Sequence, residues 1–85
     1  MKITPRQAAC IWDRFICQNM GNKGKARLAL LNYFTVKDIG DIDRIHASNY
    51  IHDIPSEDRM SVGFFSMQKL EKDWGMREVE SEENN

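Results

Sequence analysis

The sequence has little cysteine, little proline and no long apolar run, and each shortage excludes a class of protein. Two cysteines among 85 residues provide neither a disulfide framework nor the paired spacing of a zinc-binding motif. Only two prolines and 41% hydrophobic residues argue against disordered and fibrous compositions. The longest apolar run, at 8–12, is far shorter than the roughly 20 residues that span a bilayer. We therefore expect a packed, reduced, cytoplasmic protein without a membrane span.

Charge is distributed unevenly along the chain, although the net charge is only −1. Residues 1–37 hold seven lysines and arginines against one aspartate, whereas residues 38–76 hold four against eight acidic residues. Residues 77–85 add one arginine and four glutamates but a single valine, which is too little apolar surface to offset the entropy of ordering the segment. We predict a helical domain over residues 1–76 and a disordered acidic tail over residues 77–85.

The signals for helices are strongest in the first 34 residues. Thr4, Pro5 and Gln7 match a capping box with proline at the first helical position. Apolar residues then recur at helical spacing: Ala8, Ile11, Trp12, Phe15 and Ile16. Gly21 is expected to end this helix. A second helix over 22–34, capped by its asparagine, is apolar on almost every side, which predicts the central helix of the fold.

The signals after residue 34 are weaker. Thr35 with Asp38 predicts a short helix whose inward residues are Ile39, Ile42 and Ile45. We expect a loop over 46–55 with one helical turn capped by Ser48, and a last helix capped by Ser56 and ended by Gly75. Its predicted inward stripe is Met60, Gly63, Phe64, Met67, Leu70 and Trp74. Because no segment alternates apolar and polar residues as a strand does, we predict an all-α bundle of about four helices.

The residues that could support catalysis or metal binding do not form a recognisable motif. The soft metal ligands are Cys10, Cys17, His46 and His52, and their spacing matches no common zinc pattern. The aspartates within 38–43 lack the glutamate that closes a calcium loop. A nucleophile would need a neighbouring histidine and a cleft, which a domain of this size rarely builds. We therefore expect no metal, no cofactor and no enzymatic activity.

A basic segment at 21–27 is the candidate site for phosphate or nucleic acid. Two glycines at a helix N-terminus leave backbone N–H groups free to meet an anion. The candidate residues are Arg14, Lys23, Gly24, Lys25 and Arg27. No nucleotide P-loop is indicated, because the glycines are only three residues apart. A helix-turn-helix with 46–54 in the DNA groove is disfavoured, because three aspartates would face the phosphates. The alternative to a phosphate site is that Gly21 only ends the first helix and that the lysines are solvent-exposed residues at the start of the second.

A candidate protein-binding surface lies on the last predicted helix. Adjacent helical residues are about 100° apart, so if Phe64 points inward, Phe65 lies at the edge of the packed face. With two methionines it would form an adaptable apolar patch, whose members are Met60, Phe64, Phe65 and Met67. We predict a small, non-catalytic binding or regulatory protein that docks on a larger macromolecule, with a protein as the expected partner, as phage or mobile-element accessory proteins and inhibitors of host complexes do. Nucleic-acid binding and homodimerisation through the second helix are the alternatives.

Removing residues 78–85 is expected to leave the melting temperature nearly unchanged, because this segment has too little apolar surface to pack. Circular dichroism melts of the full-length and truncated chains measure the difference. A large drop would mean that the acidic segment docks on the rest of the chain.

Overall fold

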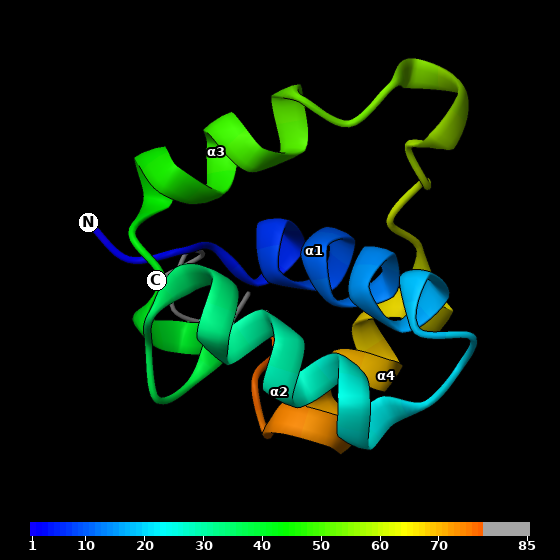
Figure 1. Ribbon diagram of the computed structural model, residues 1–85, viewed down its shortest axis with the longest axis horizontal. Helices are drawn as coiled ribbons and strands as arrows, with labels where there is room; N and C mark the ends of the chain where they lie inside the picture. Colours follow the sequence, from blue (N-terminus) through cyan, green and yellow to red (C-terminus); the bar gives the residue numbers. More distant parts are fainter. Residues whose placement is uncertain (78–85) are drawn as a thin grey trace, which may run out of the picture.

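The computed structural model describes residues 1–77, which form an all-α fold (Figure 1). The elements in chain order are α1 (Pro5–Gln18), α2 (Lys23–Phe34), the 3-10 turn η1 (Ile39–Asp41), α3 (Arg44–His52), the 3-10 turn η2 (Ser56–Asp58) and α4 (Phe64–Trp74). The predicted bundle of about four helices is therefore confirmed. Among these residues, no helix is long and apolar enough to cross a bilayer. The tail predicted over 77–85 lies, except for its first residue, outside the described range.

α1 is the central helix and contacts α2, α3 and α4 (Figure 1). Its predicted capping box forms: the Thr4 hydroxyl accepts from the Gln7 N–H at 3.1 Å, and the Gln7 side-chain carbonyl accepts from the Thr4 N–H at 3.0 Å. The prediction that the 22–34 helix is central was wrong. α2 packs on one side only, and its remaining apolar residues, such as Leu28 and Tyr33, are 65% and 52% exposed.

The segment after α2 departs from the prediction. Thr35 caps no new helix, because it takes the left-handed conformation that ends α2, with φ of 54°. Asp38 caps only η1, and Asp43 caps α3 by accepting two backbone N–H groups at 3.0 and 3.3 Å. α3 therefore fills most of the region predicted to be a loop, and Ser48 lies inside it rather than capping a turn. Ile45, predicted to face inward, is 71% exposed.

The last predicted helix is also shorter than expected. Ser56 begins only the single turn η2, and α4 starts eight residues later, after Gly63, without a side-chain cap. The Arg59 guanidinium donates to the Ile54 carbonyl at 2.9 Å, which secures the chain between the two elements. Phe64 is consequently the first residue of α4 rather than a residue in its middle.

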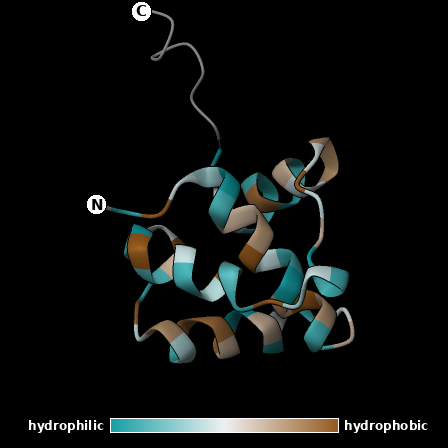
Figure 2. Cartoon of the chain, turned by 90° about the horizontal axis from the view of Figure 1, so that it is seen from above, coloured by the Kyte–Doolittle hydropathy of each residue, from teal (hydrophilic) through white to brown (hydrophobic). Residues whose placement is uncertain are grey.

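The core is one continuous cluster of buried apolar side chains. Its members are Ile3, Ala8, Ala9, Ile11, Trp12, Phe15, Ala26, Leu30, Phe34, Ile39, Ile42, Ala47 and Leu70. The N-terminal residues join it because the Ile3 N–H donates to the Ile42 carbonyl at 2.8 Å. Each helix in Figure 2 carries both hydrophobic and hydrophilic residues, as expected of helices that face the core on one side and solvent on the other.

Trp12→Ala is expected to lower the free energy of unfolding by about 3 to 5 kcal/mol, because Trp12 is the largest fully buried side chain. Ile45→Ala, at an exposed position, is the control and should change it by about 0.5 kcal/mol or less. Urea denaturation followed by circular dichroism measures both. A Trp12→Ala chain as stable as the control chain would contradict a core role for Trp12.

Candidate functional site

Two adjacent aromatic rings project from the first turn of α4. Phe64 and Phe65 are 70% and 79% exposed, and their ring centroids lie 5.6 Å apart in an edge-to-face arrangement. The expectation that Phe64 points inward was wrong. The inward stripe of α4 consists of Met67, Leu70 and Trp74, and Phe64 lies one turn before it, where no other element of residues 1–77 covers the ring. We call these two rings the Phe64–Phe65 pair.

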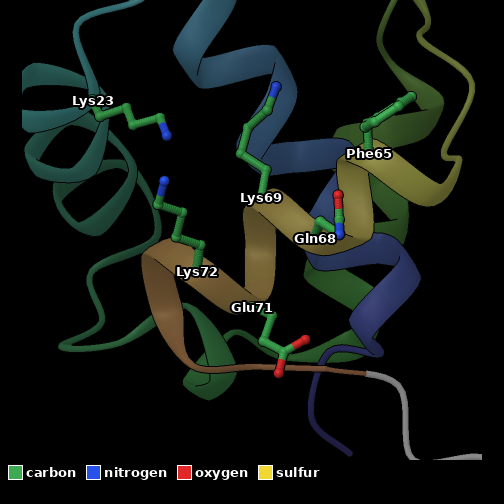
Figure 3. Close-up of a pocket in the computed structure, with 6 residues that line it drawn as sticks. All are labelled: Lys23, Phe65, Gln68, Lys69, Glu71 and Lys72. Carbon is green, nitrogen blue, oxygen red and sulfur yellow. The ribbon is translucent and has the colours of Figure 1, made fainter.

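A groove extends from this pair along α4 to the start of α2 (Figure 3). It encloses about 690 Å³, within the range of ligand-binding clefts, and it is open to solvent. We call it the lysine groove, and its lining residues are Lys23, Phe65, Gln68, Lys69, Glu71 and Lys72. Figure 3 shows the ammonium ends of Lys23 and Lys72 pointing toward each other, whereas the Glu71 carboxylate points away from both.

Two of the three lysines are held by carboxylates of neighbouring helices. The Lys23 ammonium lies 3.1 Å from Asp73, and the Lys69 ammonium lies 3.0 Å from the buried Asp13. Among the described residues, Lys72 forms no ion pair. The groove thus has two lysines held by carboxylates and a third, Lys72, that no carboxylate within residues 1–77 holds.

Lys69 and Lys72 were not among the residues predicted from the sequence to form a site. Their spacing could have indicated a shared surface: positions 65, 69 and 72 are separated by four and three residues and therefore lie on one face of a helix. The contribution of Lys23 to the same groove is a tertiary contact between α2 and α4 and has no local signal.

The five residues predicted to bind phosphate are divided among different environments. Arg14, on α1, lies beside Tyr33 near the end of α2. Tyr33 is ten residues after Lys23, which corresponds to about 15 Å along α2. Arg27 packs its guanidinium 3.7 Å from the centre of the Trp74 ring and donates to the Asp73 carbonyl.

Gly24 and Lys25 remain exposed in the first turn of α2. The Asn22 side chain already accepts the Lys25 N–H at 3.0 Å, so one of the N–H groups offered to an anion is occupied. Of the predicted set, only Lys23 lines the groove.

The two methionines of the predicted protein-binding patch lie differently. Met60 is 43% exposed in the segment before α4. Met67 is partly buried against the core, and with Phe64 it lines a second hollow of about 190 Å³ that Arg77 borders. The Phe64–Phe65 pair is therefore the most exposed part of the predicted patch, and Met67 lies beside it, partly buried.

Outside this surface, the groups with shifted pKa values are packed side chains or a helix cap. Burial raises the pKa of the Cys10 thiol, and the nearby Asp13 carboxylate raises it further. Burial likewise raises the pKa of Tyr50, whereas hydrogen bonds from backbone N–H groups lower the pKa of the capping Asp43. No three histidine, cysteine or acidic side chains within residues 1–77 are placed to hold a metal ion.

Comparison of the chain with known protein families, with curated proteins and with solved structures finds no match. Apolar rings beside a groove of lysines offer a ligand both burial of apolar surface and charge-assisted hydrogen bonds.

Lys69→Met is expected to lower the free energy of unfolding by about 1 to 3 kcal/mol, because the buried Asp13 carboxylate loses its charged donor. The matched control is Lys72→Met, which makes the same change at an exposed position on the same helix and should cost about 0.5 kcal/mol or less. Urea denaturation measures both variants. Equal stabilities would show that the Asp13–Lys69 pair contributes nothing to the fold.

Proposed function

We propose that this chain is a small binding protein that docks on a partner protein through the Phe64–Phe65 pair and the adjacent lysine groove. The observation that supports this proposal is the simultaneous exposure of two contacting rings, at 70% and 79%, on the first turn of α4. Covering one such ring is worth about 1.5 to 3 kcal/mol. A partner that covers both gains binding free energy that the folded monomer leaves unused.

The surroundings of the pair support recognition of a protein. Specific interfaces combine an apolar, often aromatic centre with a polar rim. The Phe64–Phe65 pair supplies such a centre, and Gln68, Lys69 and Lys72 follow it along the groove as the rim. By occupying a surface of its partner, a protein of this kind would act as a regulator or an inhibitor.

Nucleic-acid binding through 21–27 is the second candidate, favoured by the exposure of Lys25 at the start of α2. It has less support than protein binding. Arg27 is committed to Trp74, and Arg14 lies beside Tyr33 at the opposite end of α2 from Lys23, so these predicted phosphate contacts do not share one surface.

Placing a photo-crosslinking phenylalanine analogue at position 65 is expected to give one defined, heavier adduct in the native cell, because this position would lie inside the interface. The matched control is the same analogue at Ile45, which is 71% exposed on α3, away from the α4 surface. Gel mobility and mass spectrometry of the adduct are the measurement. Adding Phe64→Ala should reduce the yield at position 65 severalfold.

Three results would contradict the proposal. Equal yields at both positions would mean that exposure alone governs the reaction. An adduct of twice the chain's mass would favour the homodimer, and a nuclease-sensitive adduct would favour nucleic acid.

A further inference from the structure

We infer that the lysine groove receives an acidic, extended segment of the partner that also carries a large apolar side chain. One carboxylate lies between Lys23 and Lys72, and the apolar side chain packs on Phe65. This inference rests on the proposed function, because it specifies the chemistry of the partner at the same surface.

The lining of the groove is basic although the whole chain carries a net charge of −1. Three lysines line it against one glutamate, and that glutamate points away from the lysines and lies 3.7 Å from Arg77. Asp13 and Asp73 contact two of the lysines from the core side, and their side chains are only 7% and 13% exposed, against 38% for Lys69 and 48% for Lys23. The exposed side of the groove therefore presents positive charge to a ligand.

Two ammonium groups face each other across the groove, and this arrangement indicates where an anion fits. Lys23 and Lys72 come from α2 and α4, and Figure 3 shows their side chains converging. Like charges that converge repel each other unless a negative group lies between them. Asp73 supplies this only to Lys23, at 3.1 Å. A ligand carboxylate between the two lysines would accept hydrogen bonds from both.

The distance between the charged and the apolar ends of the groove sets the spacing expected in the ligand. Phe65 and Lys72 are seven residues apart on α4, which corresponds to about 10 Å along the helix. An extended peptide rises about 3.3 Å per residue. The acidic residue and the apolar residue of the partner should therefore be about three positions apart.

An acidic peptide fits this surface better than a nucleic acid does. A nucleic-acid backbone is a continuous row of phosphates and is bound by a continuous positive track. The positive track here is short and interrupted, because the groove has three lysines and passes into the apolar Phe65, and the Arg27 guanidinium is packed on Trp74. Discrete carboxylates separated by an apolar side chain match such an interrupted pattern.

The test is a selection from a library of random dodecamer peptides against the immobilised full-length chain. Enriched peptides should carry an excess of aspartate and glutamate, with a large apolar residue about three positions from an acid. Fluorescence anisotropy of one labelled selected peptide should show that its affinity for the chain falls severalfold between about 50 and about 200 mM salt. Affinity should also fall about fivefold or more in Lys72→Gln, which removes one of the two converging charges, by ordinary ion-pair magnitudes.

The matched control is Lys25→Gln, which removes the same charge from an exposed lysine outside the groove and should leave the affinity within about twofold of wild type. Phe65→Ala should weaken binding as Lys72→Gln does. Both variants change exposed side chains, so their melting temperatures should match that of the wild type and confirm that folding is intact.

Neutral apolar peptides that need Phe65 but bind Lys72→Gln normally would overturn this inference and leave the proposed function standing. Acidic peptides that bind both variants as tightly as the wild type would place their site elsewhere and also overturn it. A selection that enriches no peptide would overturn it as well. So would single-stranded DNA that displaces the labelled peptide at a lower concentration than the unlabelled peptide does. The cross-link at position 65 then decides separately whether the proposed function falls.

Discussion

The hydrogen bond from the Trp12 indole N–H to the Asp73 carboxylate, at 2.9 Å, is the contact on which the arrangement of the helices depends. A buried tryptophan needs an acceptor for its N–H group, and here the last turn of α4 supplies it. Asp73 also holds Lys23 of α2 at 3.1 Å, and Trp74 packs its ring edge-to-face against Trp12 at 5.3 Å. Arg27 covers the outer side of Trp74. Three helices therefore meet around one aspartate and two tryptophans.

The exposure of the Phe64–Phe65 pair is a consequence of this anchoring. α4 is fixed at its C-terminal end by Asp73 and in its middle by the Lys69–Asp13 pair. Its first turn has no side-chain cap and is covered by no other helix of the described part of the chain, so the two rings project beyond the packed bundle. The contacts that close the core therefore also determine where the candidate docking surface lies on the bundle.

The parts of the fold that could be predicted from the sequence are those fixed by hydrogen bonds within a few residues. The Thr4 capping box, the Asn22 cap and the left-handed Gly75 that ends α4 each act locally, and each formed as predicted. The start of α4 at Phe64 could not be predicted, because no cap marks it. It depends on contacts with distant residues, such as the 3.3 Å hydrogen bond from Arg6 to the Val62 carbonyl.

The candidate site shows the same division between local and distant causes. In the sequence, Lys23, Lys25 and Arg27 form one basic cluster, and proximity along the chain is the only available reason to group them. In the fold, Arg27 turns inward to Trp74, Lys25 stays in solvent, and Lys23 joins lysines that lie more than forty residues later. Each side chain's role follows from the group that meets it, and for Lys23 that group is Asp73, which Trp12 holds in place. A basic segment in a sequence therefore becomes a site only where the fold leaves its charges facing the same space.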